Sequence, residues 1–168
     1  SLGYRGLGLY RTTDGGAVWS RRDVSGFTGS FGGFVWYFGD LAVDPADAER
    51  VFCLGVPLIR STDGGVTFAG VTGSAHVDQH AMWIDPSDPD HFYSGNDGGV
   101  AVTGDGGRNN RFVANLPLAQ FYHVAVDMDL PYHVYGGLQD NGSWRGPSAV
   151  DQDGGIRNHF WKVVGSGD

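Results

Sequence analysis

Three polar side chains that alternate along one short stretch, His76, Asp78 and His80, could do chemistry together. Alternate side chains of an extended segment point to the same side, so the two imidazoles and the carboxylate are expected on one side of the chain. Such a set can hold a divalent metal and leave one coordination position open. Alternatively, Asp78 orients a histidine as an acid–base pair, or the three groups form a polar cluster that only fixes the loop. This spacing leaves all three interpretations open.

Two further carboxylates, Asp97 and Asp140, stand in similar glycine-containing segments, residues 96–99 and 139–142. Glycoside hydrolysis uses two carboxyl groups that face one groove, one as an acid and one as a base or nucleophile. The alternative is that both segments are turns that need Asp, Asn and Gly for backbone reasons. The candidate catalytic residues are therefore Asp97, Asp140 and Asp78.

A wider ligand-binding surface is expected around these carboxylates, because polar and aromatic side chains gather in the same segments. Trp36 and Tyr37 come from a segment rich in glycine and aromatic residues, 23–39, that forms either a stacking platform or local core. The predicted ligand-binding residues are His76, His80, Asn96, Gln139, Asn141, Trp144, Arg145, Trp36 and Tyr37.

The elements that position these residues are indicated by a turn motif, Ser61-Thr62-Asp63-Gly64-Gly65-Val66-Thr67-Phe68. The Asp can accept hydrogen bonds from backbone N–H groups of its own turn, and Gly supplies positive φ without steric cost. The motif occurs three times. Its structural residues are Thr12, Asp14, Gly16 and Trp19 in the first copy; Ser61, Asp63, Gly65, Thr67 and Phe68 in the second; and Thr103, Asp105 and Gly107 in the third.

A second pattern, an apolar strand closed by an Asp, recurs with the same period of about 42 residues at Asp44, Asp85 and Asp127. Two interleaved patterns of this period predict four strands per repeat, which is typical of β-propeller blades. The predicted fold is all-β, with consecutive four-stranded antiparallel blades in an incomplete propeller of about three and a half blades. The expected parts within residues 1–168 are a partial blade at 1–24 and blades at 41–71, 81–114 and 122–164.

Successive connections of a four-stranded meander alternate between its two ends. The turn motif joins the third and fourth strands, so it should lie at the same end as the turns that follow Asp44 and Asp85. The candidate site loops should lie at the opposite end, where a rigid scaffold commonly presents binding residues.

The turn motif resembles the Asp-box (BNR) repeat of sialidases, sortilin-type receptors, xyloglucanase-like glycosidases and photosystem II assembly-factor propellers. Longer phrases at residues 76–80, 95–99 and 137–144 resemble a bacterial subgroup described as sortilin-like or BNR-repeat glycosyl hydrolase. The resemblance implies a propeller from a secreted, periplasmic or cell-surface protein. A complete sialidase site, which needs an arginine cluster and a Tyr/Glu pair, does not fit, because the single glutamate, Glu49, is expected at the wrong end.

Composition limits the partners. The net charge is −8 with only 11 Lys and Arg residues, which argues against nucleic acid and against anionic membranes. No apolar run is long enough for membrane insertion, and Cys53 is expected as a small buried hydrophobe. The chain lacks an initiator Met and starts inside a blade, so it is expected to be a segment whose partner is the remainder of a propeller.

The main interpretation is a propeller that binds a glycan or protein ligand on its loop face. The alternatives are a glycoside hydrolase of the xyloglucanase type and a structural or assembly-factor propeller. A divalent metal is the one cofactor considered.

Overall fold

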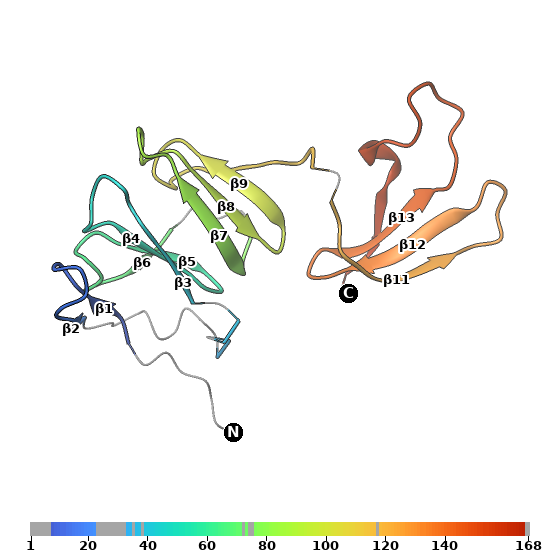
Figure 1. Cartoon of the computed structure of the whole chain (residues 1–168). Coiled ribbons are helices and arrows are strands. Elements are labelled where there is room, and N and C mark those ends of the chain that lie inside the picture. The colour runs from blue at the N-terminus through green and yellow to red at the C-terminus, as the bar shows by residue number, and fades with distance from the viewer. Residues whose placement is uncertain are drawn as a thin grey trace. The chain divides into compact units, whose positions relative to one another are not determined.

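The computed structural model describes residues 8–22, 33–34, 36–37, 39–71, 73, 76–116 and 118–166, so much of the segment 23–39 lies outside the described residues. The chain forms two compact units, unit 1 (Ser1–Ala114) and unit 2 (Asn115–Asp168) (Figure 1). Both units are built from antiparallel strands, which confirms the predicted all-β class.

The described residues of unit 1 form one two-stranded and two four-stranded sheets, each with its strands in sequence order. The small sheet pairs β1 (Tyr10–Arg11) with β2 (Ser20–Arg21). The next contains β3 (Asp40–Val43), β4 (Val51–Leu54), β5 (Leu58–Ser61) and β6 (Ala69–Gly70). The third contains β7 (Gln79–Ile84), β8 (Phe92–Asn96), β9 (Gly99–Thr103) and β10 (Arg111–Phe112). The prediction of consecutive four-stranded antiparallel sheets is confirmed.

Unit 2 is a single four-stranded meander of β11 (Phe121–Val126), β12 (His133–Leu138), β13 (Gly142–Pro147) and β14 (Lys162–Gly165). A short 3-10 turn, η1 (Asn158–Phe160), lies in the long connection before β14. Strand β11 has a register irregularity between Phe121 and His123. In unit 1, β7 has one at the corresponding place, between Gln79 and Ala81. Among the described residues, no helix is both long enough and apolar enough to cross a membrane.

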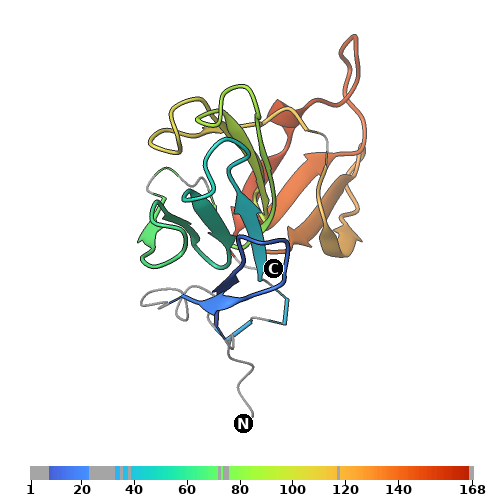
Figure 2. The ribbon, with the colours of Figure 1, turned by 60° about the vertical axis from the view of Figure 1, so that its left-hand side comes forward.

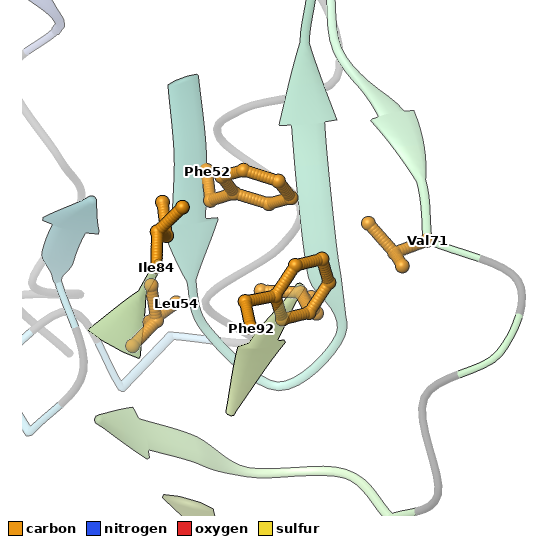
Figure 3. Close-up of a cluster of buried hydrophobic side chains, with 6 residues drawn as sticks. Phe52, Leu54, Val71, Ile84 and Phe92 are labelled. Atoms are coloured by element: carbon orange, nitrogen blue, oxygen red, sulfur yellow. The ribbon is translucent and has the colours of Figure 1, made fainter. Parts of the chain in front are cut away.

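The hydrophobic core of unit 1 lies between its two four-stranded sheets, where β3 and β4 contact β7 (Figure 2). Phe52 of one sheet and Phe92 of the other meet edge to face, with their ring centroids 5.2 Å apart (Figure 3). The cluster also contains Leu54, Leu58, Val71 and Ile84. The apolar residues of these strands therefore join neighbouring sheets.

Three turns of unit 1, residues 12–16, 61–65 and 103–107, share one hydrogen-bond pattern, and we call them the aspartate turns. In the second, the Ser61 hydroxyl donates to Asp63 Oδ1 at 2.7 Å and accepts from the Gly65 N–H at 2.8 Å. Asp63 then accepts from the Thr67 N–H at 2.8 Å and the Thr67 hydroxyl at 2.6 Å. The first turn has the same two central bonds, because the Thr12 hydroxyl donates to Asp14 Oδ1 and accepts from the Gly16 N–H.

The third aspartate turn has an asparagine, Asn109, at the position that Thr67 holds in the second turn. Asp105 accepts from the Asn109 N–H at 2.9 Å and from the Asn109 side-chain amide at 2.7 Å, as Asp63 does from Thr67. The Thr103 hydroxyl donates to Asp105 Oδ1 at 2.8 Å. A side chain with an N–H donor thus fulfils the role of the Thr hydroxyl at the same distance along the chain.

The aspartate turns lie at the same end of their sheets as the turns after Asp44 and Asp85, as the meander geometry predicts. The Gly64 N–H donates to the Glu49 carbonyl at 2.9 Å, and the Gly106 N–H donates to the Asp90 carbonyl at 2.9 Å. The Arg50 guanidinium, which is bonded to Asp44, also reaches Asp90 at 2.6 Å. This end of unit 1 is therefore fixed by hydrogen bonds and ion pairs between and within its sheets.

The third aspartate turn should make unit 1 sensitive to acid. Hydrogen bonds from the Asn109 N–H, the Asn109 side chain and the Thr103 hydroxyl lower the pKa of Asp105 from 3.8 to about 2. The ionised carboxylate is the form that the folded turn binds, so this stabilisation is present above about pH 4 and is lost as the pH falls toward 2. Urea unfolding of unit 1 across this range should show a falling midpoint.

Asp105→Asn should be less stable than the parent near neutral pH, because an amide cannot accept every bond that the carboxylate accepts. Its urea unfolding midpoint should also fall less than that of the parent between about pH 4 and pH 2. Asp151→Asn, a change of an exposed aspartate in unit 2, controls for the altered net charge. Equal acid sensitivity in the parent and in Asp105→Asn would contradict this assignment.

Candidate functional site

The segment that carries His76, Asp78 and His80 is held against the β4–β5 loop of the neighbouring sheet. The Asp78 N–H donates to the Val56 carbonyl at 2.8 Å, and the Gln79 N–H donates to the Gly55 carbonyl at 2.9 Å. The buried Gln79 side chain donates to the His76 carbonyl at 2.6 Å, which ties the start of the segment to its end. The candidate site therefore stands on two sheets of unit 1.

The expected extended alternation of His76, Asp78 and His80 is not what the structure contains. Asp78 has φ +62°, the left-handed region that non-glycine residues rarely adopt, and the register of β7 is irregular between Gln79 and Ala81. The hydrogen bonds to the β4–β5 loop hold this strained backbone in place. The premise that the three side chains lie on one side of an extended strand is therefore wrong.

The two histidines consequently have different surroundings. His76 Nδ1 lies 3.0 Å from the Val77 carbonyl oxygen, and the ring covers the backbone of Gly98, where an added Cβ would lie 2.7 Å from His76 Cγ. Among the described residues, His76 belongs to no group of three metal-ligand side chains whose donor atoms all lie within 4.8 Å. The donor atoms of His76, Asp78 and His80 are thus not gathered among the described residues, and a metal held by this set stays a prediction.

His80 instead joins Asp97, which comes from the β8–β9 turn. His80 Nε2 lies 2.7 Å from Asp97 Oδ1, and the tautomer with a proton on Nε2 donates this bond. The turn itself needs its residue types, because Asn96 Oδ1 accepts from the Gly98 N–H at 3.1 Å. Asp97 is thus presented by an Asx turn whose glycine also makes room for the His76 ring.

Asp78 lies beside this pair and completes a polar cluster of Asp78, His80 and Asp97, which we call the β7–β8 cluster. The carboxylate oxygens of Asp78 and Asp97 lie within 4.8 Å of one another. Burial and the charge of Asp97 raise the pKa of Asp78 above its ordinary value, although the neighbouring histidines act in the opposite direction. A carboxyl group with a raised pKa beside a second carboxyl group is an arrangement that can donate and accept a proton.

Aromatic rings border the β7–β8 cluster. Tyr37 meets His80 edge to face with ring centroids 5.1 Å apart, and Trp36 lies 5.5 Å from Tyr37. Both rings remain open to solvent, with exposed fractions of 65% for Trp36 and 56% for Tyr37. The described part of the aromatic segment is therefore surface beside the polar cluster rather than core.

In unit 2, the predicted residues Gln139, Asp140 and Asn141 form the β12–β13 turn. Asp140 is exposed and has φ +57°, and the Asn141 side chain donates to the Gln139 carbonyl at 2.7 Å. The Trp144 indole N–H donates to the Asn141 carbonyl at 2.8 Å. These bonds account for the residue types by turn geometry. Because Asp97 and Asp140 lie in different units, their pairing across one groove stays a prediction.

Arg145 is not part of that turn, because its side chain extends toward the start of β12. Its Nη2 lies 2.8 Å from His133 Nε2, and His133 Nδ1 lies 2.9 Å from Asp127 Oδ2. The Tyr135 hydroxyl donates to the same Asp127 oxygen at 3.0 Å. Sequence reasoning placed Arg145 with the β12–β13 turn and did not single out His133. The available signal was Asp127, which closes the first strand of its repeat and could have pointed to a partner at the start of the next strand.

Asp127, Asp129 and His133 also form a described group whose possible metal-ligand atoms lie within 4.8 Å of one another. Asp127 is already engaged by the turn, since its Oδ1 accepts from the His133 N–H at 2.8 Å and from the Asp129 N–H at 3.2 Å. These bonds and that from Tyr135 lower the pKa of Asp127 to about 2. The group therefore serves the β11–β12 turn in the same way that Asp44 and Asp85 serve theirs.

Comparison with solved structures finds GH74 enzymes. An ancestral GH74 enzyme aligns over 96% of this chain and 22% of its own, with 19% identity and a TM-score of 0.49. The GH74 xyloglucanase from Xanthomonas campestris aligns over 77% of this chain and 23% of its own, with 20% identity and a TM-score of 0.43. The chain thus spans less than a quarter of the length of either enzyme. No protein-family model and no curated protein matches the chain.

Proposed function

We propose that unit 1 belongs to a propeller of the Asp-box (BNR) type and binds a glycan at the end of its sheets that carries the β7–β8 cluster. The single observation that supports this most is the exposed Trp36–Tyr37 surface in contact with His80. Carbohydrate recognition combines an aromatic face, on which the apolar side of a sugar ring packs, with fixed polar groups that bond its hydroxyls. Trp36 and Tyr37 supply the first, and Asp78 and Asp97 supply the second.

A protein ligand is a weaker candidate for this surface. The polar groups beside the rings are carboxylates and an imidazole held in fixed positions, which suits several hydroxyl donors at short spacing. A flat apolar patch would suit a protein better. The glycan is therefore the ligand class that we propose, and a protein ligand is the other outcome of the test.

Glycoside hydrolysis is the second candidate function, and the raised pKa of Asp78 beside Asp97 favours it specifically. Retaining glycosidases place two carboxyl groups about 5 Å apart, one protonated to assist the leaving group and one ionised as the nucleophile. Asp78 would take the first role and Asp97 the second. Asp140 remains the alternative partner carboxylate in this proposal.

The test is a titration of neutral xyloglucan-type oligosaccharides into the protein by calorimetry. Trp36→Ala should weaken binding by about tenfold, because a ring at the centre of a binding surface dominates its energy. Trp83→Ala is the matched control. Trp83 is also on β7 and is 53% exposed, but it lies near the end of this strand, whereas the β7–β8 cluster lies at its start. Equal losses of affinity in both variants would contradict the assignment. If none of these sugars binds, a protein ligand would be the better hypothesis.

The same samples separate binding from hydrolysis. Release of new reducing ends that is abolished by Asp97→Asn and by Asp78→Asn would support the hydrolase, with retained anomeric configuration. Binding without any release, with Asp97→Asn only weakening affinity, would support the binding function alone.

A further inference from the structure

A pocket of about 360 Å³ lies in unit 2 at the end of the sheet where β12 begins and β13 ends. Side chains of β12, β13, the η1 turn and β14 surround it. Its lining residues are His133, Arg145, Gly146, Pro147, His159, Phe160 and Lys162. The pocket shares no residue with the β7–β8 cluster, so its ligand is a separate question.

The lining is basic in an otherwise acidic protein. Arg145, Lys162, His133 and His159 all contribute nitrogen groups, and no Asp or Glu is among the lining residues. The whole chain has a net charge of −8, and Lys162 is its only lysine. A pocket that gathers this lysine and an arginine attracts a negatively charged group.

Arg145 is held in position from behind by a chain of hydrogen bonds. The His133 tautomer with a proton on Nδ1 donates to Asp127 at 2.9 Å and accepts from Arg145 Nη2 at 2.8 Å. Asp127 stays ionised because its pKa is lowered to about 2 by the His133 N–H, the Tyr135 hydroxyl and the His133 ring. The guanidinium is therefore oriented before any ligand arrives, and that reduces the entropic cost of binding.

One N–H donor of this guanidinium has no hydrogen-bond acceptor among the described residues. The Nε atom of Arg145 is buried and makes no hydrogen bond among the described residues. An unpaired buried N–H is costly, and guanidinium groups commonly satisfy two donors at once with a carboxylate or another oxyanion. An anion bound at Arg145 would complete the hydrogen bonding of this side chain.

The remaining wall of the pocket is formed by two aromatic rings and a proline. The rings of His159 and Phe160 lie with their centroids 4.1 Å apart and are tilted by 37° to each other, and Pro147 lines the pocket with them. A volume of 360 Å³ lies at the lower end of the range for small-molecule sites. The pocket is therefore large enough for an oxyanion together with the small ring that carries it.

We propose that this pocket binds an oxyanion, with Arg145 as the principal contact and Lys162 as the second. The carboxylate of an acidic sugar and a free phosphate or sulfate share the chemistry that these two side chains recognise. Phe160 and His159 would cover a ring attached to the anion. The site is distinct from the one proposed for neutral glycans in unit 1.

The experiment uses the full 168-residue chain and three probes, galacturonate, inorganic phosphate and the uncharged galactose. Binding is followed by NMR shifts of the His133, His159 and Lys162 signals, with calorimetry for affinity. Both anions should bind saturably and more weakly at higher salt, and galactose should not shift these signals. Tighter binding of galacturonate would identify the acidic sugar as the source of the anion, and equal binding would identify a general oxyanion site.

Three variants decide the assignment. Arg145→Gln should lower anion affinity by about tenfold or more, because it removes a charge-assisted bond, and Lys162→Gln should lower it by a smaller factor. Lys162 is exposed, so its variant keeps the test valid if Arg145→Gln disturbs the β12–β13 hairpin. Arg108→Gln, at an exposed arginine of unit 1, is the matched control and should leave binding unchanged.

No saturable shift by either anion, or unchanged affinity in both the Arg145 and the Lys162 variants, would overturn the proposal. Trp36→Ala should leave anion binding intact. Failure of the glycan proposal and failure of the anion proposal are therefore observed separately.

Discussion

Phe92→Ala should destabilise unit 1 by about 3–5 kcal/mol, the usual cost of truncating a fully buried phenylalanine. The Phe92 side chain is 1% exposed and packs edge to face on Phe52, which is 0% exposed in the neighbouring sheet. Its ring also approaches the aspartate turn at Gly107, where an added Cβ would lie 3.1 Å from Phe92 Cζ. The cavity would therefore open where two sheets and a turn meet, and local collapse could fill little of it.

The measurement is urea unfolding of the whole protein combined with hydrogen exchange of the β8 amides. Tyr93→Ala is the matched control, because Tyr93 is the next residue of β8 but is 39% exposed on the other side of the strand. Its loss should cost about 1 kcal/mol through the ring contacts with Trp83 and His91. Similar losses for the two variants would show that the core is not located between β4 and β8.

Gly107→Ala should strongly destabilise the third aspartate turn and the core beside it. Gly107 has φ +87°, and an added Cβ would lie 2.5 Å from Val71 Cγ1 and 3.1 Å from Phe92 Cζ. The left-handed backbone costs an L-residue about 1–2 kcal/mol, and crowding of a packed core costs about 1–3 kcal/mol more. A combined loss of about 2–5 kcal/mol is expected in the same unfolding measurement.

Two glycines separate these contributions. Gly16 occupies the same place in the first aspartate turn with φ +98°, but the nearest atoms to an added Cβ are 3.9 Å away on Trp19, so Gly16→Ala tests the backbone cost alone. Gly104 lies inside the third turn with nothing within 4 Å and outside the positive-φ range, so Gly104→Ala should be nearly neutral. A loss in Gly104→Ala as large as in Gly107→Ala would show that any substitution disrupts this turn, against the packing argument.

The sequence by itself determined the local structure of the repeats. Within the Ser/Thr-x-Asp-Gly-Gly pattern, the first hydroxyl bonds both the Asp and the second Gly N–H, so Ser61 and Asp63 could be assigned without knowledge of distant contacts. The period of the strands determined the antiparallel meanders in the same way, because consecutive strands pair with their nearest neighbours along the chain. The end of the sheet at which each turn lies followed from the strand count alone.

The tertiary structure decided the site, because contacts between sheets set its geometry. Hydrogen bonds that Asp78 and Gln79 donate to the β4–β5 loop hold Asp78 at positive φ, so the residue spacing did not reveal that His80 pairs with Asp97. In unit 2, Arg145 turned toward His133 because a hydrogen-bond acceptor lay there, and its sequence position next to Trp144 carried no sign of that choice. Turn chemistry is local and can be derived from residue types. The side-chain partners of a binding site come from distant segments, and only the folded chain determines them.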